Sequence, residues 1–331
     1  MEKVIAVVVT HNRQALLAEC IAALRKQTRP VNSILVINNG STDGTEAWLK
    51  NQPGIDFITQ GNVGGAGGFS KAIQTGYERG YEWIWCMDDD GMPKEDALEN
   101  LLAADQNKLQ LLNCAVIDKE DKRSFVWKTG HYKTIDEVNT DTIEGIGHPF
   151  NGTLINRRIV ERVGVPRSTL FVWGDETEYY YRITRKNKIP VVTVARSIHY
   201  HPACTFSIKK NWDHSSSWKI YFYLRNRLHI QKTKFSNRLL AFFGYGCFIL
   251  AFAGTIMLYQ KTDKFKKLNF IFWPVTDALT NNFTATPANV LHKLNNQSNK
   301  SYSSFLTTPL RSLFSAVFMS SNTERSKTAT V

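Results

Sequence analysis

The chain has 331 residues, 43% of them hydrophobic, which is enough for one large or two modest globular domains with a sizeable core. Its five cysteines are widely scattered and odd in number, which excludes a disulfide-stapled secreted domain. The formal net charge of +12 is unevenly placed: residues 1–205 carry 24 basic and 25 acidic side chains, whereas residues 206–331 carry 17 and 4. The basic C-terminal part predicts an anionic partner, either nucleic acid or membrane headgroups.

The N-terminal sequence alternates between strand and helix patterns. Val4 to Thr10 is a continuous β-branched run, typical of a buried parallel strand, and it follows Met1 so closely that no secretory leader is expected. A helix is expected to run to about residue 27, followed by strands over 33–37 and 55–59. In the polar loop between these strands, Asp43 and Glu46 predict a capping box for a short helix. This order predicts a doubly wound α/β fold.

A glycine-rich stretch, NVGGAGG over residues 62–68, precedes a helix expected over 69–80. Glycines at a helix N-terminus let backbone N–H groups approach a phosphate or a sugar. The spacing matches neither a Rossmann fingerprint, which would need glycine at Ser70, nor a P-loop, since no GK[ST] is present. The glycines alone indicate ligand contact weakly, and their place just before an acidic strand end strengthens the indication.

The next strand, expected over 83–87, delivers three consecutive carboxylates, Asp88, Asp89 and Asp90, to the edge of the sheet. Three adjacent like charges repel one another unless a cation neutralises them. Because alternate side chains of an extended chain point to opposite faces, we expect Asp88 and Asp90 to share one face while Asp89 turns to the other. Two such carboxylates suit Mg²⁺ or Mn²⁺ carrying a substrate diphosphate. The alternative is a solvated acidic turn.

Regular elements continue beyond the acidic residues, and we expect a helix over 95–104, strands over 110–117, 124–133, 150–155 and 189–194, and a helix from about 157. A hydrophobic strand over 170–173 is expected to end at Gly174. Asp175, Glu176 and Glu178 then open a helix, whose N-terminal dipole should favour their ionised form. The alternative for this cluster is a helix start that merely carries acids.

Taken in order, the pieces VVVTHNR, QTRP, INNGSTDGT, NVGGAGG, MDDDGMP, WGDETEY and HYHP resemble the inverting family 2 glycosyltransferases of the GT-A fold. The resemblance covers roughly residues 3–205, and it lies in the ordered set rather than in any single piece. The DDD form is similar to that of the bacterial galactofuranosyl- and rhamnosyltransferases that build O-antigens, capsules and cell-wall galactans. It implies an α/β GT-A catalytic domain over 1–205, with a Rossmann-like mixed sheet flanked by helices.

The resemblance also implies roles for the matching residues. Asp88 and Asp90 would hold a divalent metal, Mn²⁺ or Mg²⁺, and His201 would complete its coordination, the alternative being a structural histidine at a strand end. Asn38 departs from the family pattern, in which many relatives carry Asp. The nucleotide-sugar donor would lie against Thr10, Asn12, Arg13, Asn39, Asp43, Asn62, Gly64, Gly65 and Asp89, with Asp89 near the donor sugar or ribose.

Inverting sugar transfer needs a carboxylate that removes the proton of the acceptor hydroxyl in line with the departing diphosphate. Asp175 and Glu176 are the candidates. Relatives usually place Asp at the second position, and the longer Glu176 side chain would displace the carboxylate, so both residues stay open as the base. The resemblance places Trp173 and Glu178 at the acceptor.

The C-terminal sequence predicts a basic, hydrophobic, mainly helical region over 206–294 and a polar, mobile tail over 295–331. Between Arg238 and Lys261 the chain has 22 residues without a charge, enough to cross a bilayer. Three interpretations stay open: a segment embedded in or lying on the membrane, a buried hairpin packed on the catalytic domain, and a single span. No nucleic acid partner is expected, because no RNP, KH or helix-turn-helix pattern is present.

The combined prediction is a metal-dependent inverting hexosyltransferase at the cytoplasmic face of a bacterial inner membrane, peripheral or monotopic, and compatible with a homo-oligomer. Its predicted donor is UDP-galactofuranose, and its acceptor is a lipid-linked or polysaccharide glycan. Three alternatives were weighed: a rhamnosyltransferase using dTDP-rhamnose, a catalytically silent glycan- or membrane-binding protein of the same fold, and a nucleotidyltransferase, which would release pyrophosphate.

Overall fold

The computed structural model describes residues 2–105, 109–203, 207–215 and 217–297. The chain divides into two compact units. The N-terminal unit consists of Met1–Phe171 and Asp175–Thr205, and the C-terminal unit consists of Val172–Gly174 and Phe206–Val331.

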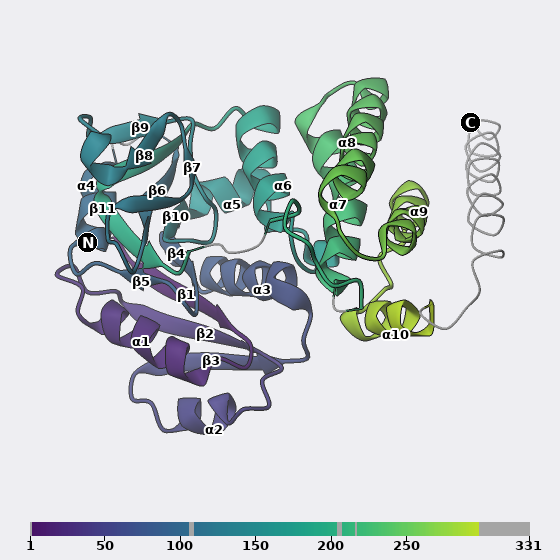
Figure 1. Cartoon of the computed structure of the whole chain (residues 1–331). Helices are drawn as coiled ribbons and strands as arrows, with labels where there is room; N and C mark the ends of the chain where they lie inside the picture. Colours follow the sequence, from purple (N-terminus) through teal and green to yellow (C-terminus); the bar gives the residue numbers. More distant parts are fainter. Residues whose placement is uncertain (1, 106–108, 204–206, 216, 298–331) are drawn as a thin grey trace, which may run out of the picture. The chain divides into compact units, whose positions relative to one another are not determined.

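The N-terminal unit is built on one mixed sheet with the strand order β3-β2-β1-β4-β10-β6-β11-β5 (Figure 1). Its parallel half consists of β1 (Val4–Thr10), β2 (Ser33–Asn39), β3 (Ile55–Gln60) and β4 (Trp83–Asp88). The other half contains β10 (Thr153–Asn156), which runs antiparallel to β4, together with β6 (Leu111–Asp118), β11 (Val191–His201) and the short β5 (Met92–Pro93). The carboxyl ends of β1 and β4 therefore meet at one edge of the sheet, where ligands bind in open α/β sheets.

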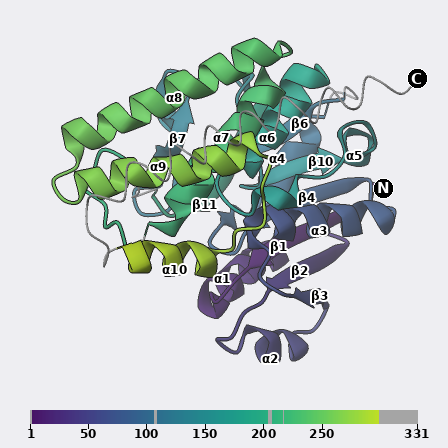
Figure 2. The same ribbon diagram turned by 90° about the vertical axis from the view of Figure 1, so that its right-hand side faces the viewer.

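A hydrophobic layer lies on each face of this sheet. Along β1, Val4, Ala6 and Val8 belong to one layer and Ile5, Val7 and Val9 to the other, as expected of a strand buried on both faces. The first layer is covered by α1 (Gln14–Arg25), α2 (Thr45–Lys50) and α4 (Ala97–Ala103), and the second by α3 (Gly64–Glu78), α5 (Arg157–Val163) and α6 (Asp175–Tyr181) (Figure 1, Figure 2). This arrangement confirms the predicted fold class.

Two predicted strands have a different form. The strand expected over 124–133 is a hairpin of β7 (Ser124–Thr129) and β8 (Tyr132–Thr134), because Gly130 turns the chain with a φ of +63°. The strand expected over 170–173 is absent: a 3₁₀ turn over Ser168–Leu170 is followed by positive φ values of 67° at Phe171 and 56° at Trp173. Hydrophobic composition alone gave no sign of these left-handed residues.

Helix α3 begins inside the glycine-rich stretch rather than at Phe69. A Cβ at Gly64 would lie 2.0 Å from the carbonyl oxygen of Phe171, and a Cβ at Gly68 would lie 2.4 Å from the side chain of Val9. These two glycines therefore let the helix approach its own unit closely, whereas a Cβ at Gly65 would meet nothing within 4 Å. Close packing thus explains the glycines at 64 and 68, and the donor contact of Gly64 and Gly65 stays a prediction.

The C-terminal unit is helical in its described part. Helix α7 (Trp218–Lys234) packs against α8 (Arg238–Tyr259), α9 (Lys264–Leu279) and α10 (Pro287–Gln297) (Figure 2). Polar groups lie between them: Tyr221 donates a hydrogen bond to Asp277 at 2.5 Å. Of the tail predicted over 295–331, the first residues end α10, and the remainder lies outside the described residues.

Among the described helices, α8 is long and apolar enough to cross a membrane by length and composition, with a mean hydropathy of 2.0 over its most apolar window. Only 22% of that window is buried. One stripe of the helix is buried, namely Ala241, Tyr245, Phe252 and Ile256. The opposite side exposes large apolar side chains, including Leu239, Phe243, Leu250 and Leu258, each more than two thirds exposed.

Candidate active site

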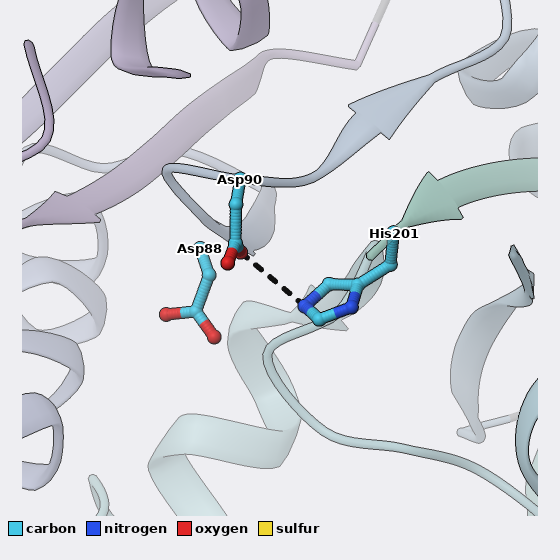
Figure 3. A group of neighbouring side chains, drawn as sticks. All are labelled: Asp88, Asp90 and His201. Atoms are coloured by element: carbon cyan, nitrogen blue, oxygen red, sulfur yellow. Dashed lines mark ion pairs between the residues drawn. The ribbon is translucent and has the colours of Figure 1, made fainter. Parts of the chain in front are cut away.

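Three of the predicted metal ligands lie together at the carboxyl end of β4. Asp88 ends the strand, Asp90 lies in the turn that follows, and His201 ends β11. One ligand atom from each residue lies within 4.8 Å of the other two, and Nε2 of His201 is 3.3 Å from Oδ1 of Asp90 (Figure 3). Asp88 and Asp90 thus lie together as predicted, but the chain is not extended there: Asp89 and Asp90 form a turn in which the amide of Gly91 donates to the carbonyl of Asp88 at 3.2 Å.

Asp89 turns away from this group and is 3% exposed. The hydroxyl of Thr10 donates a hydrogen bond to its Oδ2 at 2.8 Å, and Nη1 of Arg13 lies 3.2 Å from its Oδ1. The same Arg13 nitrogen lies 2.8 Å from Oδ2 of Asp90. Thr10 and Arg13 therefore brace the acidic turn, and a donor contact by Asp89, which stays a prediction, would have to displace one of these partners.

His201 is oriented to coordinate through Nε2. Its Nδ1 lies 2.7 Å from the carbonyl oxygen of Pro202, which can only accept a hydrogen bond, so Nδ1 carries the proton. Burial lowers the pKa of His201, but its contacts with Asp90 outweigh this and raise it, so Nε2 carries a second proton toward Asp90 when the ring is charged. In the neutral ring the lone pair of Nε2 is free for a metal, a common arrangement for a metal-binding histidine. His199 is instead a core residue: it is fully buried, a Cβ at Gly91 would lie 2.1 Å from its ring, and burial lowers its pKa to about 3.

The acidic turn concentrates negative charge. Burial raises the pKa of Asp88 well above its ordinary value, and the carboxylates of Asp90, Asp89 and Glu176 raise it further. Burial also opposes ionisation of Asp90, but its contacts with His201 and Arg13 outweigh this and lower its pKa. Two carboxylates that repel each other, with one imidazole beside them, are a donor set that fits Mn²⁺ or Mg²⁺. The residues present therefore suit the predicted divalent cation.

Asp175 and Glu176 form a second acidic group at the start of α6. Burial raises the pKa of Asp175 to about 7, and the charge of Asp88 adds to the effect. Burial also raises the pKa of Glu176 to about 8, with a further contribution from Asp175. Backbone hydrogen bonds at the helix start lower both values by less than burial raises them. The helix start therefore favours the ionised form of both acids, as expected, but burial has the larger effect.

Glu178, predicted at the acceptor, is fully buried between two arginines. Its Oε1 lies 3.1 Å from Nε of Arg167, and its Oε2 lies 3.0 Å from Nη2 of Arg182. These ion pairs anchor α6, and the acceptor contact of Glu178 stays a prediction. Trp173, the other predicted acceptor residue, belongs to the C-terminal unit, where its ring meets that of Tyr223 edge-on with centroids 6.2 Å apart.

Asn39 and Asn62, both predicted to contact the nucleotide, form hydrogen bonds with other groups of the protein. Asn39 is 2% exposed; its Oδ1 accepts hydrogen bonds from Gln60 and from the amide of Val63, and its Nδ2 donates to the carbonyl of Gly64 at 2.9 Å. Oδ1 of Asn62 accepts from the amide of Gly64 at 3.0 Å. Both side chains shape the loop ahead of α3, and a direct contact with the nucleotide stays a prediction.

The second polar loop is held in a similar way. Asn12, at a φ of 55°, accepts a hydrogen bond from the amide of Thr42 at 2.6 Å and so ties the end of β1 to this loop. Asp43 accepts from the amide and hydroxyl of Thr45. The predicted capping box is not formed, because Glu46 pairs with Lys50 at 2.9 Å.

One neighbour of the metal-ligand group was missed by the sequence analysis. Trp127 of β7 lies against both His201 and His148, with ring centroids 5.0 Å and 5.3 Å away. Burial lowers the pKa of His148 to about 4, so its ring is neutral at pH 7. The local pattern marks Trp127 only as a strand residue, because its contact with His201 joins strands that are distant in sequence.

Comparison with known proteins gives a consistent picture. The profile described as Glycosyl transferase family 2 matches residues 5–164. The chain is 33% identical over 223 residues to galactofuranosyltransferase GlfT1 of Mycolicibacterium smegmatis, covering 63% of this chain and 74% of that protein. It is also 33% identical over 215 residues to galactofuranosyltransferase GlfT1 of Mycobacterium tuberculosis, covering 61% and 70%. The crystal structure of S. aureus TarS shares the fold, with a TM-score of 0.51 at 13% identity over 89% of this chain and 53% of that one.

Proposed function

We propose that this chain, which belongs to glycosyl transferase family 2 and is a glycosyltransferase, moves galactofuranose from UDP-galactofuranose to a lipid-linked or polysaccharide glycan with inversion. The observation that carries the proposal is the group of Asp88, Asp90 and His201 at the end of β4. These three side chains could bind a cation, and the chain is 33% identical to proteins named galactofuranosyltransferase. The named relatives support the choice of sugar.

A divalent cation held by Asp88, Asp90 and His201 would neutralise the charge that develops on the departing diphosphate. The protein's own contribution is to hold the ligands in place. Arg13, half-exposed and bound to both Asp89 and Asp90, fixes the acidic turn and brings a permanent positive charge to the same edge. Thr10 holds Asp89 from β1, so the turn keeps its shape.

The proton of the acceptor hydroxyl would pass to a carboxylate at the start of α6. Each of these acids is close enough to Asp88 for their charges to interact. A raised pKa suits a general base, because a base with a pKa near the working pH accepts a proton readily. We assign the base to Glu176, which is partly exposed, and give Asp175, which is 3% exposed, the task of raising the pKa of Glu176.

We further propose that α8 lies in the plane of the membrane interface. Its exposed stripe is apolar from Leu239 to Leu258, and basic residues such as Arg238 and Lys261 flank both ends. Its buried stripe packs against α7, which carries arginines and lysines along its length. A span by α8 would draw these polar groups into the hydrocarbon, whereas an interfacial helix places one face in lipid and leaves α7 outside it.

Nucleotide release tests the proposed transfer. The chain would be incubated with UDP-galactofuranose or dTDP-rhamnose and a lipid-linked galactan acceptor, with and without a chelator. We expect UDP release and a lengthened glycan with UDP-galactofuranose only, both lost on chelation. Turnover with dTDP-rhamnose instead would replace the donor, turnover that ignores the chelator would remove the metal from the reaction, and pyrophosphate release would indicate a nucleotidyltransferase.

A further inference from the structure

Within the loop over 147–152, two buried side-chain atoms have no hydrogen-bond partner among the described residues. They are Nε2 of His148 and Oδ1 of Asn151, and the loop leads into β10. Asn151 is 6% exposed, and its Nδ2 donates to the carbonyl of Pro149 in the same loop at 3.3 Å. An unsatisfied buried polar atom costs about 1–3 kcal/mol, so it is retained where a bound molecule can complete the hydrogen bond.

This loop lies against the end of β4. The amide of Gly152, next to Asn151, donates to the carbonyl of Cys86 at 3.0 Å, two residues before Asp88. Beyond His148, the ring of Trp127 continues to His201, one of the three metal-ligand residues in Figure 3. The three side chains Trp127, His148 and Asn151 thus adjoin the place where the diphosphate of a donor is expected.

The loop is also held rigidly. Phe150 adopts a φ of 72°, and its ring stacks on that of Phe69 with centroids 4.3 Å apart. A Cβ at Gly147 would lie 2.5 Å from Nδ2 of Asn113, so the backbone of the loop packs closely against β6. Backbone strain of this kind persists when the surrounding structure fixes it, and it is common at binding sites. A fixed loop presents its polar atoms in one geometry, as a selective site requires.

We propose that Trp127, His148 and Asn151 form a subsite for a sugar ring. The partly exposed indole would pack against the apolar face of the ring. Oδ1 of Asn151 can only accept a hydrogen bond, and sugar hydroxyls donate them, whereas a fully ionised diphosphate has no proton to offer. The subsite rests on the proposed function, and the ring is either the sugar being transferred or the terminal sugar of the acceptor.

Steady-state kinetics of Trp127→Ala and Asn151→Ala test the subsite, with Tyr132→Ala as the matched control. Tyr132 lies in the same hairpin, but its ring contacts that of His131 at a centroid distance of 4.0 Å, tilted by 39°. We expect the KM for one sugar substrate to rise at least about tenfold in both subsite variants, equivalent to about 1.4 kcal/mol. The Mn²⁺ concentration for half-maximal rate and the Kd of UDP alone should match those of the wild type, and Trp127→Phe should recover part of the loss.

The same data separate the sources of the sugar. A raised KM for the nucleotide sugar assigns the subsite to the transferred residue, and a raised KM for the acceptor assigns it to the glycan. If the wild type is active and both variants keep its KM values, the subsite is overturned but the proposed function is not. A loss confined to Mn²⁺ half-saturation would overturn it too, making Trp127 only a support for His201. If Trp127→Ala fails to fold, the KM values of Trp127→Phe and Asn151→Ala test the subsite instead. A wild-type chain that uses no nucleotide sugar would overturn both the proposed function and the subsite.

Discussion

Proteins usually bury apolar side chains and expose charged ones. The acidic edge of the N-terminal unit and helix α8 of the C-terminal unit depart from this pattern in opposite ways. The first buries carboxylates: Asp175 is 3% exposed, and burial raises the pKa values of Asp88 and Glu176. The second exposes apolar side chains, with Leu250 74% and Leu258 79% exposed. Elsewhere in the N-terminal unit the usual pattern holds, and β1 is buried on both faces.

The contrast shows what kind of partner each region lacks. Burying like charges destabilises the protein, and a bound cation offsets that cost. Exposing apolar surface to water is also unfavourable, and contact with lipid offsets that cost. Each unfavourable feature therefore indicates the chemistry of the partner that would offset it, and does so more directly than composition does. The four predictions that follow remove one departure at a time.

The largest effect is expected from Asp90→Ala. The substitution removes one ligand of the cation, so turnover should fall at least about a thousandfold, of the order seen when charge stabilisation in a transition state is lost. Rates of UDP release with Mn²⁺ measure it, and circular dichroism checks the fold. Asp56→Ala, which removes an exposed acid paired with Arg79, is the matched control and should stay near wild type. Near-normal turnover in Asp90→Ala would take Asp90 out of the site.

Comparison of Glu176→Gln with Asp175→Asn separates the two acids of α6. Glutamine keeps the shape of the side chain but cannot accept the proton, so kcat should fall about a hundredfold or more below that of Asp175→Asn. The pH profile of kcat supplies the second readout, because Asp175→Asn should lower the apparent pKa of the remaining base. Equal and mild losses in the two variants would place the base elsewhere, and a deeper loss in Asp175→Asn would reverse the assignment.

The apolar face of α8 is tested by Leu250→Asp combined with Phe243→Asp. Each buried side chain of this size contributes roughly 1.5–3 kcal/mol, so affinity for vesicles containing anionic lipid should fall at least about tenfold. Vesicle flotation measures it, and Lys71→Glu, which reverses an exposed charge on α3, changes the net charge by the same two units and serves as the control. Vesicle binding that survives in the double variant but disappears in high salt would show that charge alone holds the chain to the membrane.

The smallest effect concerns stability without metal. Folding raises the pKa of Asp175 from 3.8 to about 7 and that of Glu176 from 4.5 to about 8, so between these values the native state binds more protons than the unfolded chain. Stability should therefore be lost as the pH rises through this window, at about 2–4 °C in Tm for each kcal/mol. Thermal scans in chelator measure it. Glu176→Gln should flatten the dependence, and a Tm that rises with pH would contradict the burial of these acids.

Much of the N-terminal unit was predictable because its strands are continuous apolar runs: β1 was expected at Val4 to Thr10 and is observed there. The grouping of Asp88 with Asp90 was predicted from the alternation of an extended strand, whereas a turn that begins at Asp88 produces it. His201, by contrast, reaches the acidic turn only through the long strand β11, whose bulge between Val194 and Ile198 no local pattern reveals. Its assignment as a ligand came from the resemblance to family 2 rather than from the residues.

The remaining misses have a common physical cause. The ion pairs of Glu178 with Arg167 and Arg182 were not predicted, because tertiary ion pairs leave no periodic pattern in a sequence. Trp127 was assigned to a strand without a role for the same reason. The glycines of the NVGGAGG stretch were noticed, but sequence cannot tell close contact with Phe171 from close contact with a ligand.

The position of a bound cation is the most direct test of the metal assignment. A crystal grown with Mn²⁺ and UDP would be measured for anomalous scattering from manganese. We expect a peak that joins the carboxylates of Asp88 and Asp90 to Nε2 of His201 and contacts the diphosphate of UDP. A peak elsewhere, with these three side chains bare and the nucleotide bound at another edge, would contradict it.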